Sequence, residues 1–337
     1  MMNIWEDMNP KLGERMSKKI KTLFVTEKWC DANPDKGLTN NYHNLFKTYS
    51  NAIPDSHFDI VHFDEYSLIK KKHIDEFLIK LIQDKKPDVV VFSLLGKSHL
   101  NPTRKSYEAM REQGCKMIFV WPDIGHDWGI PEINLFNREG WADLHVCWGR
   151  EQNVQQSYEN LLWLWAPQDE KLYHPTEDEQ DIKMSFLGSK DRRYQERVYY
   201  LNHLQQNGVD FFAGGGQREK RMSPSEYADV MRRSKISLNF PYCPSGFDQC
   251  KGRVWEILAS KSLLFERKNE ATAGMLTPGV HYVEYENAQD LIDKYKYYLE
   301  NEEERQKIAQ QGYDVYYEKY SAKSYWTQVM KGIGIDV

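Results

Sequence analysis

Cysteine is scarce in this sequence, and the few cysteines are scattered. They are Cys30, Cys115, Cys147, Cys243 and Cys250. Because their number is odd and no two of them form a C-x-x-C pair, the pattern indicates neither a disulfide framework nor a zinc site. We expect single thiols in the core or in loops.

Long apolar runs are missing too. No stretch approaches the roughly 18 to 20 apolar residues that span a bilayer, and the polar residues 1–10 lack the apolar segment of a signal peptide. The sequence therefore predicts a cytoplasmic protein with no integral membrane segment.

Positive charge is not in excess, and several enzyme motifs are absent. The 45 Lys and Arg stand against 50 Asp and Glu, a net charge of −5, which argues against a protein held on nucleic acid by bulk charge. The sequence has no G-x-x-x-x-G-K-[ST] phosphate loop, no G-x-S-x-G turn and no H-E-x-x-H helix. These absences leave no basis for an ATPase, an esterase or a metalloprotease.

Apolar residues are plentiful and are arranged in short runs. With 337 residues, 40% of them hydrophobic, the chain is long enough for two globular domains. Runs rich in Val, Ile and Phe alternate with amphipathic stretches, a pattern typical of parallel strands joined by crossover helices. The predicted strands of the first half are 21–27, 58–63, 88–95, 116–121 and 143–148. Helices are predicted over 73–84 and 103–113.

The same alternation begins again after an acidic segment, 176–181. Strands are predicted at 182–187, 209–213, 235–240, 262–266 and 281–285, and helices at 192–204, 224–233 and 253–260. The expected fold is therefore α/β, with two Rossmann-like, doubly wound domains that face each other across a cleft. We place a first domain at 20–168, a linker at 169–181, a second domain at 182–300, and C-terminal helices at 301–337 that pack back across the domains.

Ligands of such sheets bind at the carboxyl ends of the strands, so the strand-to-helix junctions were searched for functional groups. The richest junction is 238–267, LNFPYCPSGFDQCKGRVWEILASKSLLFER. Asp248 is expected in a loop and Glu256 one turn inside the following helix, a spacing that lets both carboxylates reach one ligand near the helix N-terminus. Two plainer interpretations stay open: Asp248 caps the helix, or Glu256 is solvated.

These residues resemble a known family. The segment RVWEILASKSLLFE, followed by MLTPGVHYVEYENAQDLIDKYKYYLENEEERQKIAQQGYD, is similar to the C-terminal half of GT-B glycosyltransferases of family 4, also called group 1. It is most similar to the branch that includes spore-maturation glycosyltransferases. In this family two acids separated by seven residues close the donor site. The resemblance implies that Glu256 holds the ribose hydroxyls and that Asp248, one methylene shorter than the usual Glu, faces the transferred sugar.

The resemblance also implies a phosphate site without a metal. Basic side chains and helix N-termini stabilise the leaving diphosphate in this family, and the implied cations are Lys190, Arg193 and Arg253. A solvated helix face is the plainer interpretation of Arg192, Arg193 and Arg197. The implied backbone contacts to the donor are Gly214, Gly215, Gly252 and Gly37. The implied catalytic histidine is His126, whose plainer role is to tie down its own loop.

Together these features predict a retaining, metal-independent hexosyltransferase that takes a UDP- or GDP-linked sugar and needs no cofactor. The acceptor is left open among glycan, lipid, protein and modified nucleic acid, because acceptor choice depends on variable loops. Two alternatives remain: a sugar-nucleotide epimerase on the same fold, and a non-catalytic nucleotide or sugar binder.

Overall fold

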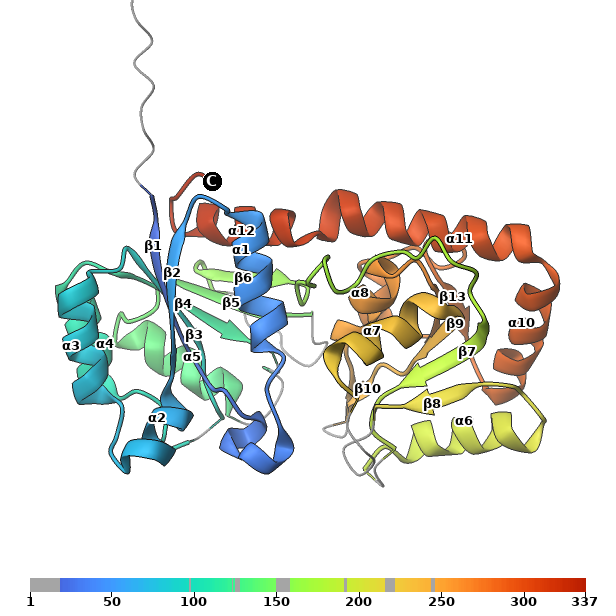
Figure 1. Ribbon diagram of the computed structural model, residues 1–337, viewed down its shortest axis with the longest axis horizontal. Helices are drawn as coiled ribbons and strands as arrows, with labels where there is room; N and C mark the ends of the chain where they lie inside the picture. Colours follow the sequence, from blue (N-terminus) through green and yellow to red (C-terminus); the bar gives the residue numbers. More distant parts are fainter. Residues whose placement is uncertain are drawn as a thin grey trace, which may run out of the picture.

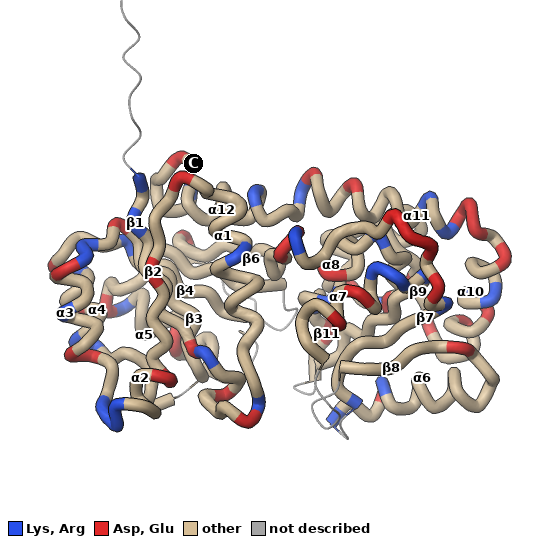
Figure 2. The backbone as a smooth tube through the Cα atoms, in the orientation of Figure 1, with Lys and Arg blue, Asp and Glu red and all other residues tan. Residues whose placement is uncertain are grey.

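The chain forms two α/β lobes that lie side by side, with the C-terminal helices running along both (Figure 1). The computed structural model describes residues 19–96, 98–122, 124, 128–149, 158–190, 193–215, 222–243 and 246–337. Basic and acidic residues are interspersed along both lobes in the view of Figure 2, so this view shows no face of a single charge.

The first lobe is built on a six-stranded sheet in which every pairing is parallel. Its strands are β1 (Lys21–Thr26), β2 (His57–His62), β3 (Val89–Ser93), β4 (Lys116–Trp121), β5 (Leu144–Trp148) and β6 (Leu161–Leu164). Their order is β2-β1-β3-β4-β5-β6. Alternate residues of β1 pack on opposite faces, because Phe24 belongs to one apolar cluster and Leu23 and Val25 to another.

Helices and short turns connect these strands and cover both faces of the sheet. The helices are α1 (Thr48–Ala52), α2 (Phe63–Lys70), α3 (Asp75–Lys85), α4 (Arg104–Glu112) and α5 (Gly129–Arg138). Shorter turns of helix occupy Cys30–Ala32, Pro34–Lys36 and Tyr42–Lys47 in the connection between β1 and α1.

The second lobe has a five-stranded parallel sheet and a small hairpin. The sheet strands are β7 (Ile182–Leu187), β8 (Phe212–Gly214), β9 (Ser234–Asn239), β12 (Leu263–Arg267) and β13 (Val283–Tyr285). Their order is β13-β12-β9-β7-β8. The antiparallel hairpin pairs β10 (Tyr242–Cys243) with β11 (Phe247–Asp248).

Some helices of this lobe start with local capping signals. The helices are α6 (Gln195–Gln206), α7 (Pro224–Arg233), α8 (Gly252–Ala259), α9 (Glu270–Ala273), α10 (Ala288–Glu300) and α11 (Glu302–Val315). Ser223 and Glu226 form a capping box around Pro224 at the start of α7, and the Asn287 side chain caps α10. These caps explain why α7 and α10 begin where they do.

Most predicted elements match the observed ones to within three residues. The predicted strand 209–213 begins later, at Phe212, and the C-terminal helices predicted from 301 begin with α11 at Glu302. The fold class is confirmed: α/β, with two Rossmann-like, doubly wound lobes. The limits predicted for the two domains and the linker stay predictions.

The chain crosses between the lobes twice, and the two crossings touch. The first crossing leads from β6 to β7, and the second leads from α11 through the π-helical turn η4 (Tyr316–Tyr320) to α12 (Ala322–Gly332), which packs on α1, β5 and β6. Glu170 in the first crossing accepts hydrogen bonds from the Ala322 N–H at 2.8 Å and from the Tyr316 hydroxyl at 3.4 Å. One carboxylate thus joins both crossings.

A single apolar cluster continues from the first lobe into the second. It includes Phe24 and Trp326 in the first lobe, and Trp255 and Leu258 of α8 in the second. The outer face of each sheet has a separate cluster of its own. The inner faces of both sheets and the crossing segments are therefore held in one continuous core.

Candidate functional site

The strand order of the second sheet reverses between β7 and β9, and this is where ligands of open parallel sheets bind. Gly188 follows β7 and is buried. A Cβ atom at Gly188 would lie 2.6 Å from Arg253 Nη2, so the guanidinium of Arg253 lies directly over the end of β7. Gly215, with φ of 77°, approaches the same point: a Cβ there would lie 3.3 Å from both Gly188 N and Tyr227 Cε2. The glycines leave room for backbone and guanidinium to meet.

Arg253 is held at two of its nitrogens. Its Nη1 donates to Asn239 Oδ1 at 2.8 Å, and its Nε donates to the Tyr227 hydroxyl at 3.3 Å. Burial opposes the charged form of Arg253, but the neighbouring Tyr227 and Glu256 outweigh it and raise the pKa of the guanidinium above its ordinary value. Arg253 is therefore a fixed cation at the end of β7.

Glu256 lies one turn further along α8 and is partly buried. Its Oε2 accepts a hydrogen bond from the Tyr227 hydroxyl at 3.1 Å, and Tyr173 of the first crossing is a second donor. Burial raises the pKa of Glu256, while Arg253 and the two tyrosines oppose the rise. The interpretation of Glu256 as a solvated side chain is therefore wrong.

Glu266 forms the buried end of the same network. It is the register partner of Asn239 between β12 and β9, and its Oε2 accepts from Asn239 Nδ2 at 2.7 Å. Its Oε1 accepts from Asn269 Nδ2 and from Thr272 Oγ1, both at 3.3 Å. Burial raises the pKa of Glu266 to about 8.

Asp248 belongs to a neighbouring group of charges. It is the last residue of β11, and its Oδ1 pairs with Arg267 Nη2 at 2.5 Å, while Arg267 Nε pairs with Glu196 at 2.9 Å. The N-cap of α8 is Lys251, and no side chain caps that helix, so the interpretation of Asp248 as its cap is wrong. Asp248 and Glu256 therefore bind different partners. The neighbouring β12 residues Glu266 and Arg267 belong to the two different groups: Glu266 to the network of Arg253, and Arg267 to the ion pairs of Asp248.

Arg197 was expected on a solvated face, but it is only 4% exposed. Its Nη1 donates to the Ser189 carbonyl at 2.6 Å, and its guanidinium lies 4.0 Å from the centre of the Tyr194 ring. Burial and nearby Arg253 lower its pKa to about 10. The helical spacing of Arg197, Leu201 and Leu204 could have revealed this, because it puts Arg197 on the buried stripe of α6.

Lys190, Arg193, Gly214 and Gly252 also lie in the second lobe. Lys190 and Arg193 are exposed in the connection between β7 and α6. Gly214 ends β8, and its carbonyl accepts from Gly188 N at 2.8 Å. Gly252 packs against the first crossing, since its carbonyl accepts from Gln168 Nε2 at 3.3 Å. The structure therefore brings Arg253, Glu256 and Gly215 together, and puts Gly252 at the junction of the lobes.

Two further predicted site residues, Gly37 and His126, belong to the first half of the chain. Gly37 has φ of 76° and closes the turn after β1, where its carbonyl accepts from Cys30 N at 3.0 Å. His126 lies outside the described residues. The first lobe also reverses its strand order, between β1 and β3, and Glu27 follows β1 at that point. Burial, with the charges of Asp64 and Asp31 added, raises the pKa of Glu27 to about 7.

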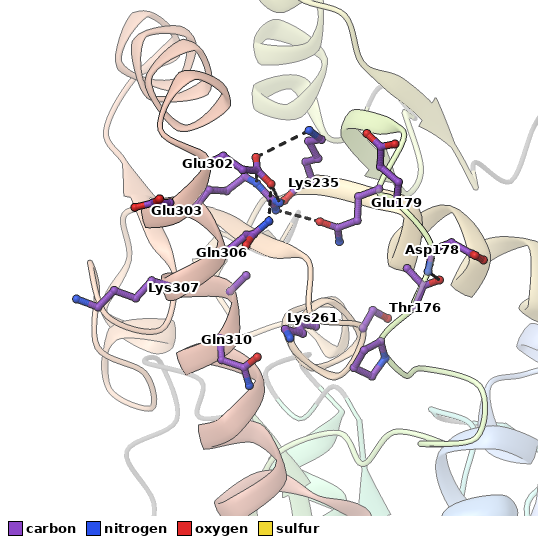
Figure 3. A pocket seen from close by; sticks show the side chains of 15 residues that line it. Thr176, Asp178, Glu179, Lys235, Lys261, Glu302, Glu303, Gln306, Lys307 and Gln310 are labelled. Atoms are coloured by element: carbon purple, nitrogen blue, oxygen red, sulfur yellow. Dashed lines mark hydrogen bonds and ion pairs between the residues drawn. The ribbon is translucent and has the colours of Figure 1, made fainter.

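A separate hollow lies at the other end of the second sheet. It has a volume of about 790 Å³ and is lined by the first crossing, by α11 and by Lys235 and Lys261 (Figure 3). Lys235 is the second residue of β9 and Lys261 precedes β12, so this hollow is at the amino ends of the strands. Arg305 crosses one side of it and bonds Glu302, Gln180 Oε1 and the Lys235 carbonyl. The hollow therefore lies at the opposite end of the strands from the switch point between β7 and β9.

Two absences hold for the part of the chain that the structure describes. There, no group of three or more His, Cys, Asp or Glu side chains is placed to hold a metal ion. Within the same ranges, none of the helices has both the length and the apolar character needed to cross a membrane.

Comparison with known proteins gives a family match for slightly less than half of the chain and fold matches for nearly all of it. Residues 168–331 match a family model described as glycosyl transferase-like. Among curated proteins, none matches this sequence.

Three solved structures share the fold. HepE from Anabaena, in complex with UDP and glucose, has a TM-score of 0.59 at 11% identity, and the match covers 94% of this chain and 99% of HepE. A glycosyltransferase from Rickettsia africae has a TM-score of 0.63 at 12% identity, with 94% and 98% covered. Sucrose-phosphate synthase from Thermosynechococcus elongatus has a TM-score of 0.59 at 10% identity, with 94% and 99% covered. The chain has the GT-B fold of these proteins, and its residues 168–331 are similar in sequence to glycosyl transferases.

Proposed function

We propose that the protein transfers a sugar from a nucleoside diphosphate sugar, UDP- or GDP-linked, to an acceptor hydroxyl. The observation that carries this proposal is the fixed guanidinium of Arg253 over the end of β7, with the Glu256 carboxylate one turn away on the same helix. A cation and a carboxylate so arranged suit a diphosphate joined to a ribose. The UDP in the HepE structures supports a UDP-linked donor.

Each group has a separate part in this proposal. Arg253 neutralises the diphosphate as it leaves, and buried Arg197 adds positive charge nearby. The Glu256 carboxylate accepts hydrogen bonds from the ribose hydroxyls, since two tyrosine donors leave some of its lone pairs for a ligand. Asp248 faces the sugar. Lys190 and Arg193 are exposed in the connection between β7 and α6 and supply further positive charge for the phosphates.

The proposed reaction retains the anomeric configuration and needs no metal. The bond from the anomeric carbon to the phosphate oxygen breaks, and the acceptor oxygen bonds to that carbon on the same face. The acceptor proton passes to the departing phosphate, which leaves as the nucleoside diphosphate. The protein orients both substrates and offsets the charge on the phosphate. Membership of the spore-maturation branch and a cytoplasmic location stay predictions.

A panel of nucleotide sugars tests this proposal. Binding is read from the thermal midpoint, and the best binder is then assayed for release of the nucleoside diphosphate, with and without a chelator. Binding with turnover that survives the chelator supports the proposal. Binding without turnover would identify a non-catalytic binder, turnover restored only by Mg²⁺ or Mn²⁺ would contradict metal independence, and no binding to any member would contradict the function.

A further inference from the structure

Glu266 is a buried carboxyl that does not touch the proposed ligand site itself. Its side chain lies at the end of β12 with 0% exposure, where an unpaired carboxylate would be costly. It accepts one short hydrogen bond from Asn239 and two longer ones from Asn269 and Thr272. The strand register fixes the short one, because Glu266 and Asn239 are direct partners in the parallel pair of β12 and β9.

The Asn239 amide joins this carboxyl to Arg253. An amide has a donor end and an acceptor end, and the two look alike in shape. Glu266 Oε2 accepts from the nitrogen of Asn239, at 2.7 Å, and this oxygen can accept in either protonation state of the carboxyl group because a proton can reside on Oε1 instead. The Asn239 oxygen then faces Arg253 Nη1, at 2.8 Å, and a guanidinium only donates. In this orientation of the Asn239 amide, each donor between Glu266 and Arg253 faces an acceptor; in the reversed orientation the amide NH₂ would face the guanidinium.

The guanidinium is fixed by this chain of hydrogen bonds on one side and by Tyr227 on the other. Asn239 holds Nη1 and the Tyr227 hydroxyl holds Nε, and the remaining nitrogen, Nη2, lies over Gly188. A long arginine side chain has much rotamer freedom, and two anchors remove it. If the Asn239 amide turned over, its NH₂ group would face the guanidinium, and one anchor would become a repulsive contact.

We propose that Glu266 is a positioning residue that, through the Asn239 amide, holds Arg253 over the end of β7 in the orientation that binds the diphosphate of the donor. This inference rests on the function proposed above. In this inference a buried carboxyl group strengthens a site for an anion. Glu266 does so because its hydrogen bond fixes the orientation of the Asn239 amide, which in turn holds Arg253.

Exchanging the amide and the carboxyl group between positions 239 and 266 tests the proposal. In Glu266→Gln the new amide can turn its NH₂ group toward Asn239, so the Asn239 nitrogen is no longer assured of an acceptor and its anchor on Arg253 is weakened. In Asn239→Asp two carboxyl groups face each other. In the double variant, the amide at position 266 donates to a carboxylate at position 239, and that carboxylate accepts from Arg253. The direction of these hydrogen bonds is thereby restored, and one buried carboxyl is kept.

The measured quantity is the affinity of UDP relative to uridine, and of GDP relative to guanosine, by calorimetry. The ratio isolates the diphosphate from the base and ribose. We expect each single variant to lower this ratio by about tenfold, the loss of one hydrogen bond to a charged group, and the double variant to recover most of it. Thr272→Val is the matched control: it removes another donor to Glu266 but leaves the Asn239 amide oriented, so the ratio should not change.

The outcomes separate the two proposals. An unchanged ratio in folded Glu266→Gln, or no recovery in the double variant, overturns the positioning role while the nucleotide site stands. If Glu266→Gln does not fold, the double variant is compared with Asn239→Asp, and recovery is still required. A wild-type protein that binds neither diphosphate better than its nucleoside overturns the proposed function, and the positioning role with it.

Discussion

The two lobes share a topology but differ in the side chains at their switch points. Each sheet reverses its strand order once beside its first strand, between β1 and β3 in one lobe and between β7 and β9 in the other. In the first lobe, Glu27 lies there with Asp64, which is fully buried and accepts from the backbone of Lys28 and Trp29. In the second lobe, Arg253 and Arg197 occupy the corresponding place.

This difference shows that the fold provides a position and that side chains decide which ligand charge it accepts. Buried carboxylates repel a phosphate, and the raised pKa of Glu27 shows that charge is already disfavoured beside Asp64. Guanidiniums at the same position attract it. The comparison supports the proposed binding of the donor diphosphate by the second lobe.

The strongest way to break the comparison is to remove the cation of the second lobe. Arg253→Met should lower the affinity for UDP or GDP by at least about 100-fold, because hydrogen bonds to a charged group of roughly 1.5–3 kcal/mol each are lost. Calorimetry on the folded variant measures this. Lys28→Ala removes a cation from the first lobe and should leave the nucleotide affinity unchanged. Equal losses of nucleotide affinity in both variants would contradict the proposed difference between the two lobes.

Glu256→Ala addresses the ribose. We expect binding of the bare nucleoside diphosphate and of the sugar nucleotide to weaken alike, by about 1.5–3 kcal/mol, because the carboxylate contacts a part that both ligands share. Affinities of the two ligands, measured side by side, give the answer. A folded variant with normal nucleotide affinity would remove Glu256 from the site.

Asp248→Asn should separate the sugar from the nucleotide. The variant should bind the free nucleotide normally but transfer sugar about tenfold more slowly, because the lost charge acts on the sugar and its transition state. Arg267 keeps its pairing with Glu196, so little stability should be lost. Transfer at the normal rate would leave Asp248 as a partner of Arg267 only.

Glu27→Gln gives the smallest expected effect, and it concerns stability. The pKa of Glu27 is about 7 in the fold, against an ordinary value of 4.5, so the folded state holds a proton that the unfolded state has released. Stability therefore falls as pH rises from 4.5 to about 7, and the variant escapes this loss. We expect it to be more stable than wild type by about 1 kcal/mol above pH 7, allowing for partial exposure, and equal to it below pH 4.5.

Urea unfolding at several pH values checks this prediction. Glu65→Gln is the control, because Glu65 is another partly exposed carboxylate of the first lobe but pairs with Lys28. A stability difference between Glu27→Gln and wild type that does not change with pH would contradict the explanation.

The sequence predicted the sheets better than the small elements. Buried strands such as β4 and β7 are apolar runs with β-branched residues, and such runs indicate strands by themselves. The hairpin of β10 and β11 was missed, and β6 was not predicted from a pattern of its own. β6 has four residues and each hairpin strand has two, which is too short for a periodic pattern, so their structure depends on the contacts around them.

The site was predicted in part for the same reason. Arg253 and Glu256 lie in one motif helix, and a resemblance along the chain is enough to find them. Asn239 and Glu266 are joined by the register of two strands, which no local pattern encodes. A polar residue at the end of each apolar run was the available signal. Tyr173 lies beside Glu256 only because the first crossing folds back onto α8.

The carboxylate of Glu170, which joins both crossings, makes them act as one connection. Glu170 bonds Ala322 and Tyr316 of the other crossing, and Tyr316 belongs to the apolar cluster that continues from one lobe into the other. A displacement of one crossing would strain the hydrogen bonds to the other. Any relative displacement of the lobes would therefore have to displace both crossings and their shared core together.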